Sequence, residues 1–344
     1  MQSIVSIVIP TYGRDAVLVD SIRALLALSE PADELLVLDQ TPTHEPETEA
    51  ALSAWDADGS IRWVRHAPPG VVGAMNRGLR EAKGDIVLFL DDDIIPHRNL
   101  VVAHRQAYVE HPEAWAVVGQ VIQERNAETL KTEKLKGEAE RENAENRKPE
   151  HRENRLEGKS QGKGMLISVF QRFSISAFSS KRTSALRKDL DFGFNGTEPA
   201  WVENVMAGNL SVRRDKAIAL GGFDENFVPP VSFRFETDFA RRIVEAGGKI
   251  WFEPKASIRH LRAARGGTRT GGGHMASGSP LHGVGDYYYA LKHGKGWDRF
   301  RYMARRPFRE ICTKFHLCHP WWIPVKFMGE VRALALAFKL MQDT

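Results

Sequence analysis

Short apolar runs alternate with amphipathic segments over the first ninety residues of the chain. Residues 4–9 are a β-branched run, and their near-continuous hydrophobicity is typical of a strand buried on both faces. Pro10 ends this run. Within residues 15–28 apolar side chains recur at helical spacing, and residues 34–38 form a second apolar run. The pattern predicts a βαβ unit.

The same alternation continues further along the chain. It predicts a helix near residues 45–55, a strand over 61–64, a helix over 72–82 and a strand over 85–90. Strands that alternate with helices indicate an α/β fold, here a Rossmann-like, mainly parallel sheet flanked by helices.

The character of the sequence changes after residue 123. Residues 124–163 hold 11 Lys and Arg and 10 Asp and Glu but no Val, Ile or aromatic residue, so they cannot build a core. The helix pattern resumes over 236–246, where Gly247 stops it, and a strand follows over 249–252. Residues 262–285 are rich in Gly and Arg, as a mobile loop would be.

These changes divide the chain into four parts. Residues 1–123 and 196–262 are the two halves of the α/β domain, and residues 124–195 are a charged, partly flexible insertion between them. Residues 263–344 are a flexible basic loop followed by an amphipathic helical tail.

The positive charge is concentrated near the C-terminus. Residues 241–344 carry 19 Lys and Arg against 7 Asp and Glu, whereas the formal charge of the whole chain is only +4. This asymmetry indicates a polyanionic partner, which could be nucleic acid, an anionic membrane surface or a phosphate-bearing substrate.

The cysteine content and the first residues of the chain indicate the cellular compartment of the protein. Cys312 and Cys318 are too few for a disulfide framework, and the apolar run before Pro10 lacks the basic start and cleavage site of a signal peptide. We therefore expect a cytoplasmic protein. Peripheral association with the inner face of the plasma membrane stays open, because the tail interleaves Arg and Lys with aromatic residues. The alternative is a tail packed back on the domain.

Three carboxylates follow the strand predicted over 85–90. Asp91, Asp92 and Asp93 lie where parallel sheets bind their ligands, beyond the carboxyl end of a strand. They would repel one another without a counter-charge, and carboxylate oxygens suit Mg²⁺ or Mn²⁺. The alternative is an acidic turn that caps the next helix.

Six sequence blocks, taken together and in this order, resemble the family 2 glycosyltransferases of the GT-A fold. The resemblance covers roughly residues 3–262. The blocks are residues 6–12 (SIVIPTY), the strand end at Asp39, residues 73–78 (GAMNRG), residues 89–93 (FLDDD), residues 221–225 (GGFDE) and residues 236–239 (ETDF).

The resemblance implies an inverting enzyme with a nucleotide-sugar donor and a Mg²⁺ or Mn²⁺ cofactor. In such an enzyme Asp39 would accept a hydrogen bond from the base, which favours a UDP- or dTDP-linked donor. Asp91, Asp93 and His260 would bind the metal. The other residues implied to bind the nucleotide are Pro10, Thr11, Tyr12, Arg14, Asn76 and Asp92.

The resemblance also implies a carboxylate base at the start of the helix over 236–246. Glu236 takes this position, where the family often has Asp. The alternative is that Glu236 and Asp238 only favour the helix N-terminus. Contacts to the acceptor or the diphosphate are expected from Trp201, Asp238, Arg265 and Arg269. A plain core position for Trp201, a solvated turn for Asp39 and a solvated basic loop around His260 are the corresponding structural alternatives.

We therefore expect a hexosyltransferase-like enzyme that moves a sugar to a hydroxyl of a saccharide or a lipid-linked acceptor. The family's bacterial members suggest a role in polysaccharide or glycolipid assembly for the cell envelope. The alternative is a non-catalytic protein that binds a nucleotide or nucleic acid through its basic C-terminal region. No nucleic-acid motif occurs in the sequence, so we do not expect a nucleic-acid partner.

Overall fold

The computed structural model describes residues 3–123, 193–229, 232–263, 266 and 275–343. The chain divides into two units, one made of residues 1–123 and 183–344 and the other of residues 124–182. The second unit, and with it nearly all of the predicted insertion, lies outside the described residues, so the four-part division stays a prediction.

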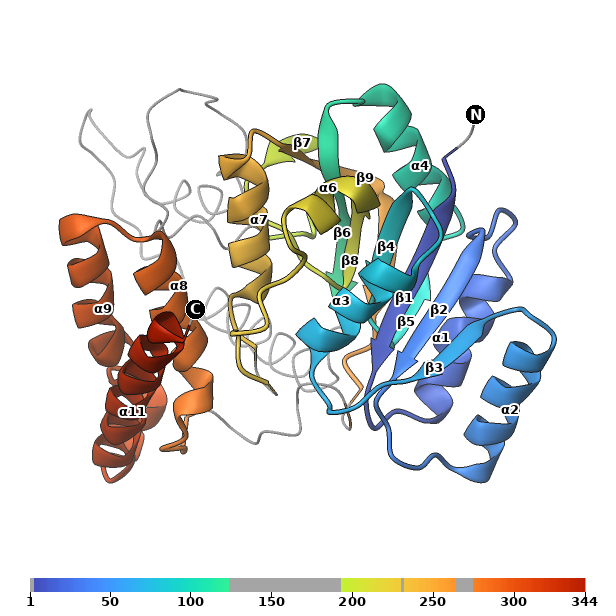
Figure 1. Ribbon diagram of the computed structural model, residues 1–344. Coiled ribbons are helices and arrows are strands. Elements are labelled where there is room, and N and C mark those ends of the chain that lie inside the picture. Colours follow the sequence, from blue (N-terminus) through green and yellow to red (C-terminus); the bar gives the residue numbers. More distant parts are fainter. Residues whose placement is uncertain (1–2, 124–192, 230–231, 264–265, 267–274, 344) are drawn as a thin grey trace, which may run out of the picture. The chain divides into compact units, whose positions relative to one another are not determined.

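The N-terminal third confirms the predicted alternation of strands and helices (Figure 1). Each predicted element is present within a few residues of its expected bounds. The elements are β1 (Val5–Thr11), α1 (Ala16–Leu26), β2 (Glu34–Asp39), α2 (Pro46–Ala57), β3 (Arg62–Arg65), α3 (Val71–Glu81) and β4 (Ile86–Leu90).

The following elements complete the sheet and its helical cover. They are β5 (Ile94–Pro96), α4 (Leu100–Glu110), β6 (Ala114–Gln123), β7 (Ala200–Val202), β8 (Asn209–Arg213), α6 (Arg214–Ala219), α7 (Phe235–Glu245) and β9 (Lys249–His260). The strand predicted to end at residue 252 therefore continues to His260. Pro254 is accommodated because the pairing of β9 with β6 is irregular there, jumping from Glu253 to Ser257.

The described strands form one mixed sheet in the order β3-β2-β1-β4-β8-β6-β9-β5, with β7 added beside β9. The strands β1 to β4 are parallel to one another, β8 runs antiparallel between β4 and β6, and β6 and β9 are parallel. The carboxyl ends of β1, β2, β4, β6 and β9 consequently meet at one edge, together with the start of β8. This edge carries the candidate site.

Alternate residues of the central strands feed two cores, one on each face of the sheet. Ile7 and Ile9 of β1 pack with Leu18 and Ile22 of α1. Val8 faces the other way, into a core that includes side chains of α3 and α7. The sheet is thus covered by helices on both faces, which is the α/β sandwich that the sequence predicts (Figure 1).

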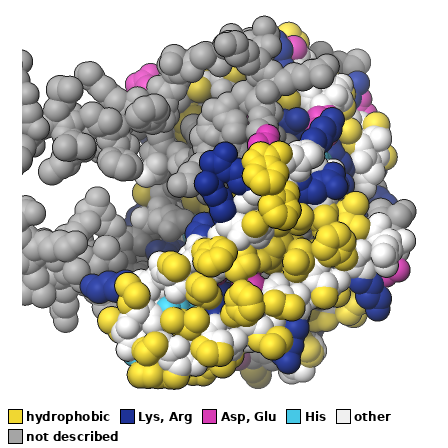
Figure 2. Space-filling model, turned by 90° about the vertical axis from the view of Figure 1, so that its left-hand side faces the viewer, with side chains coloured by type: hydrophobic (Ala, Val, Ile, Leu, Met, Phe, Trp, Pro, Cys, Tyr) yellow, Lys and Arg dark blue, Asp and Glu magenta, His cyan; other side chains and the backbone are white. Residues whose placement is uncertain are grey.

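The tail forms helices that pack back on the domain. They are the short 3-10 turn η3 (Pro280–His282), α8 (Val284–His293), α9 (Gly296–Ile311), α10 (Lys314–Cys318) and α11 (Trp322–Gln342). Tyr287 and Tyr288 of α8 and Ala333 and Ala337 of α11 join the same core as Val8. The side of the molecule formed by α9 and α11 nevertheless exposes many hydrophobic side chains (Figure 2). Among the described helices, none is long and apolar enough to cross a membrane.

A buried polar network joins α4 to β8. The two ring nitrogens of His104 lie 2.9 Å from Asn209 Oδ1 and 2.8 Å from Ser211 Oγ. Full burial lowers the pKa of His104 to about 4, so the ring stays neutral in the folded protein.

Acidification should therefore destabilise the fold through His104. An unfolded histidine takes up a proton near pH 6.5, but the folded one resists protonation until about pH 4, so this stabilisation is present above pH 6.5 and is lost as the pH falls. We expect the free energy of unfolding, measured with denaturant, to fall by about 2 kcal/mol more between pH 7 and pH 5 than it does in a His104→Gln variant. Equal pH dependence in both proteins would contradict this expectation.

Candidate active site

The three carboxylates after β4 differ in their surroundings. Asp92 is buried, accepts a hydrogen bond from Thr11 Oγ1 at 2.8 Å and pairs with Arg14 Nε at 3.1 Å. Burial raises the pKa of Asp92 to about 6, and Arg14 opposes that shift. Asp92 therefore ties β4 to the end of β1.

Asp93 and His260 come together from the ends of β4 and β9. The Oδ1 atom of Asp93 lies 3.0 Å from His260 Nε2. The Oδ2 atom accepts hydrogen bonds from the Ala263 amide at 2.7 Å and from Arg14 at 3.1 Å. Burial raises the pKa of Asp93, but His260, the Ala263 amide and Arg14 outweigh it and hold this pKa below its usual value. The carboxylate is thus ionised and held in one orientation.

Asp91 completes a group that could hold a metal ion. Its Oδ2 atom lies 3.7 Å from His260 Nε2, and its side chain is 40% exposed, whereas that of Asp93 is 1% exposed. One ligand atom from each of Asp91, Asp93 and His260 lies within 4.8 Å of the others. Two carboxylates and an imidazole at this spacing fit Mn²⁺ or Mg²⁺.

Ala207 and Gly208, just before β8, link this group to α7. A Cβ atom on Gly208 would collide with the Asp91 carboxylate, so a larger residue at this position would displace that carboxylate. The neighbouring Ala207 amide donates a hydrogen bond to Glu236 Oε1. Glu236 and Asp91 therefore contact two consecutive residues of the loop before β8, Ala207 and Gly208.

Glu236 lies in the first turn of α7. Burial raises its pKa to about 7, the negative charge of Asp91 adds to that shift, and the Ala207 amide opposes it. A carboxylate with a pKa near 7 can hold or release a proton at neutral pH, which a general base requires. The position that the sequence indicates for the base is thus beside the metal-ligand group.

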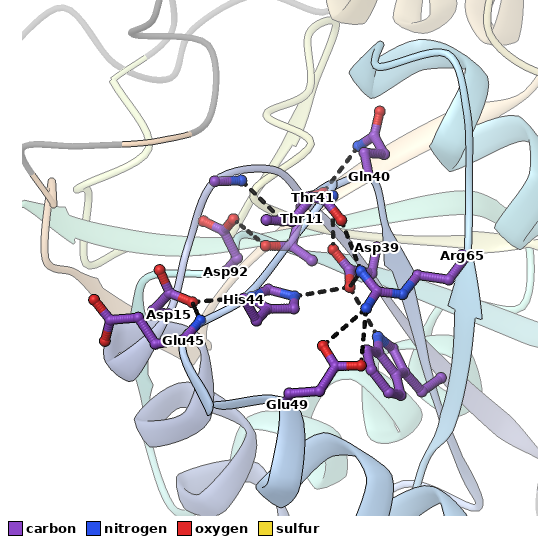
Figure 3. A network of polar contacts seen from close by, with 12 residues as sticks. Thr11, Asp15, Asp39, Gln40, Thr41, His44, Glu45, Glu49, Arg65 and Asp92 are labelled. Atoms are coloured by element: carbon purple, nitrogen blue, oxygen red, sulfur yellow. Dashed lines mark hydrogen bonds and ion pairs between the residues drawn. The ribbon is translucent and has the colours of Figure 1, made fainter. Parts of the chain in front are cut away.

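Asp39 lies at the carboxyl end of β2 within a polar network (Figure 3). Its side chain is buried, and its Oδ2 atom is 2.8 Å from His44 Nε2, 2.9 Å from Trp63 Nε1 and 3.0 Å from Arg65. Its Oδ1 atom accepts a bond from the Thr41 amide. These contacts occupy the Asp39 carboxylate, so the structure provides no support for the prediction that Asp39 accepts a hydrogen bond from the base.

The sequence analysis did not predict the residues that pair with Asp39. Arg65 is its register partner on the neighbouring parallel strand β3, and strand register is the one sequence signal that could have indicated the pair. No pattern in the sequence indicated that His44 and Trp63 contact Asp39.

Three further residues that were predicted to contact ligands make contacts within the protein. Asn76 exchanges hydrogen bonds of 2.8 Å with both the amide and the carbonyl of Phe223, so it holds the turn of the 221–225 block. Asp238 is buried and pairs with Arg242, Lys292 and His293, each at 2.8 Å, which binds α7 to α8.

Trp201 is the third of these residues and lies away from the site. It pairs with Trp251 across β7 and β9, and its ring also contacts His111. Trp251 precedes His260 by nine residues on the same strand, a span on the order of 25 Å. Trp201 therefore lies far from His260 along β9, and its predicted contact to the acceptor or the diphosphate stays a prediction.

The basic loop after β9 is described only in part. Arg265 and Arg269 lie outside the described residues. The backbone amides of Leu261 and Ala263 both bond to Asp93, and Gly266 lies so close to Gly13 that a side chain there would collide with its backbone. The described start of this loop thus covers the residues that follow β1, where Tyr12 is half-buried.

Comparison with known proteins agrees with this geometry. Residues 6–175 match the family model described as glycosyl transferase family 2. This matching part of the chain is similar to glycosyl transferase family 2. A relative is the protein of Bacillus subtilis (strain 168) described as uncharacterized glycosyltransferase YfnE, which is 30% identical over 115 residues. That alignment covers 33% of this chain and 29% of the relative, so the chain matches less than a third of that protein.

Solved structures confirm the GT-A glycosyltransferase fold of this chain. The crystal structure of GalNAc-T7 with UDP, GalNAc and Mn²⁺ superposes with a TM-score of 0.56 at 12% identity, over 99% of this chain and 55% of that one. The mannosyltransferase PcManGT from Pyrobaculum calidifontis, in complex with GDP-Man and Mn²⁺, gives a TM-score of 0.50 at 17% identity, over 100% of this chain and 79% of that one.

Proposed function

We propose that this protein is an inverting, metal-dependent glycosyltransferase that moves a sugar from a nucleoside-diphosphate donor to an acceptor hydroxyl. The observation that carries the proposal is that two consecutive residues contact Glu236 and Asp91: the Ala207 amide donates a hydrogen bond to the Glu236 carboxylate, and Gly208 lies against the Asp91 carboxylate. A proton acceptor near Asp91, which belongs to the group of Asp91, Asp93 and His260, supports the proposed reaction. The match to the glycosyl transferase family 2 model, and neighbours of the same fold with UDP or GDP-Man and Mn²⁺, support sugar transfer from a nucleotide-linked donor.

Asp91, Asp93 and His260 would hold the cation. Bound there, Mn²⁺ or Mg²⁺ would neutralise the negative charge that accumulates on a departing diphosphate. Arg14 and the Ala263 amide keep Asp93 ionised and oriented for this role, and Gly208 leaves room for Asp91.

Glu236 would act as the general base. In the proposed step the acceptor oxygen forms a bond to the anomeric carbon while the bond from that carbon to the diphosphate oxygen breaks. The acceptor proton passes to Glu236, and the bonding electrons leave with the nucleoside diphosphate. Attack on the face opposite the leaving group inverts the anomeric carbon.

The identity of the substrates is a finer proposal. The sequence favours a UDP- or dTDP-linked donor and a saccharide or lipid-linked acceptor in polysaccharide or glycolipid assembly at the cell envelope. The buried state of Asp39 weakens the argument for a uracil or thymine base, so the donor must be found by titration.

Calorimetric titration with UDP, dTDP and GDP, each with and without Mn²⁺, tests the metal site. We expect one nucleotide to bind more tightly with Mn²⁺, and an Asp91→Ala variant to lose at least about tenfold of that affinity, since even indirect partners of a metal contribute this much. Asp91 is suited to substitution because its side chain is 40% exposed.

An Asp20→Ala variant is the matched control, because Asp20 is an exposed aspartate that pairs with Arg23 on the surface of α1. It should bind nucleotide as the native protein does. An equal nucleotide affinity with and without Mn²⁺, or an unchanged affinity in Asp91→Ala, would count against the role of Asp91 as a metal ligand. If folded native protein bound no nucleotide at all, the family fold would remain but the proposed donor would be wrong.

A further inference from the structure

Helix α9 presents an apolar stripe to solvent. Large side chains at positions i, i+3 and i+11 of the helix are Trp297, Phe300 and Phe308, which are 69%, 56% and 65% exposed. Arg306, on the opposite side of the helix, is buried against Asp286 and Glu330. The helix therefore buries one arginine, Arg306, while its three large aromatic residues face solvent.

Helices α10 and α11 extend the exposed apolar surface. Most of the large hydrophobic side chains that the described structure exposes lie on the tail. On α10, α11 and the segment between them they are Leu317, Trp321, Val325, Phe327, Met328, Val331, Phe338 and Met341. We call these eight residues, with the three of α9, the tail surface. A solvent-facing apolar surface of this extent indicates an interaction site.

Basic side chains accompany the tail surface. Between residues 294 and 343 the exposed cations are Lys295, Arg301, Arg305, Arg309, Lys314, Arg332 and Lys339. The exposed acids in the same stretch are Asp298 and Asp343. Figure 2 shows Lys and Arg side chains beside the hydrophobic ones on this face. Aromatic groups combined with an excess of positive charge match the interfacial region of an anionic bilayer, where rings enter the headgroup layer and cations meet lipid phosphates.

From these observations we infer that the tail surface docks the protein on an anionic lipid membrane. Trp297, Phe300 and Phe308 enter the interface, while Arg301 and Arg305, which flank the stripe on α9, contact the headgroups. The helices lie on the bilayer, since no described helix could cross it. The inference goes beyond the proposed function, because the tail surface contains none of Asp91, Asp93, His260 or Glu236.

Vesicle co-sedimentation of the full chain tests this inference. We expect binding to vesicles of phosphatidylcholine with about 30% phosphatidylglycerol, weaker binding to phosphatidylcholine alone, and weaker binding at high salt. The double variant Trp297→Ser, Phe308→Ser should lower the partition coefficient at least about tenfold, because two aromatic side chains no longer leave water. The double variant Arg301→Glu, Arg305→Glu should abolish the preference for the anionic vesicles.

Val109→Ser is the matched control, because Val109 is 72% exposed on α4 and lies outside the tail surface. It should bind vesicles as the native protein does. Equal unfolding midpoints for all the proteins would exclude an effect on folding.

Three outcomes would overturn the inference. The first is no binding of the native protein to either vesicle. The second is a native dimer that the aromatic variant converts to monomers, measured by sedimentation velocity, since the tail surface would then contact a second copy. The third is binding to an oligonucleotide, but not to vesicles, that the charge variant abolishes. None of these outcomes bears on nucleotide binding at Asp91, so the two proposals fail separately.

Discussion

Replacement of Glu236 by Gln should lower kcat by about 10²–10⁴-fold, the usual contribution of a general base. The amide keeps the size of the side chain but cannot accept the acceptor proton. The Ala207 amide can still donate to the side-chain oxygen, so the loop before β8 should keep its position. The measurement is the initial rate of sugar transfer, once the titrations have identified the donor nucleotide.

The affinity for the donor nucleotide distinguishes a variant that has lost only its general base from one whose binding site is damaged. The Gln variant should bind the nucleotide and Mn²⁺ as tightly as the native protein, because the metal-ligand group is intact. In the native enzyme the rate should rise with pH as Glu236 loses its proton, since only the ionised form is a base, and this dependence should vanish in the variant. Native rates in the Gln variant would refute the assignment of Glu236.

Replacement of Asp286 by Ala should lower the free energy of unfolding by about 3–5 kcal/mol, the usual effect of breaking a buried ion pair. Asp286 is fully buried in α8 and pairs with Arg234 at 3.0 Å, with Arg309 at 2.9 Å and with Arg306. Burial raises the pKa of Asp286, but the three guanidinium groups outweigh it and keep the carboxylate ionised. Its removal leaves the buried charge of Arg306 with fewer partners.

Denaturant unfolding measures this loss, and Asp298→Ala provides the control because Asp298 is an exposed aspartate in the first turn of α9. The control should change stability by less than about 0.5 kcal/mol. Arg234 immediately precedes α7, so the Asp286 variant should also lose transfer activity through a displaced Glu236. An unchanged unfolding midpoint would show that the three arginines are satisfied without Asp286.

The place of Asp91 and Asp93 after a strand could be predicted from the sequence, because residues 85–90 are an apolar run and the aspartates follow it directly. The end of β9 could not be predicted in this way, since the apolar pattern stops at residue 252 and β9 continues to His260. His260 and Glu236 were indicated by the family resemblance alone. The structure brings one ligand atom each of Asp91, Asp93 and His260 within 4.8 Å of the others.

Residues whose roles depend on packing partners could not be assigned from the sequence. Asp238 resembles a ligand contact in sequence, but Lys292 and His293, which hold it, come from α8 more than fifty residues later. Asn76 likewise bonds to a turn 147 positions away. Trp201 pairs with Trp251 across β7 and β9, and no local pattern in the sequence encodes that pairing.

The position of β8 in the sheet determines the order in which the strands can pair while the protein is being synthesised. β3, β2, β1 and β4 can pair once residue 90 has left the ribosome, but the free edge of β4 must wait for β8, whose first residue is Asn209. At the usual rate of about 5–20 residues per second, that wait is roughly 6–24 s. During it, the backbone edge of Ile86–Leu90 has no strand partner on one side, and nascent chains are exposed to aggregation in that interval. A chaperone acting on this protein would be needed before the second half of the chain is made, not after its release.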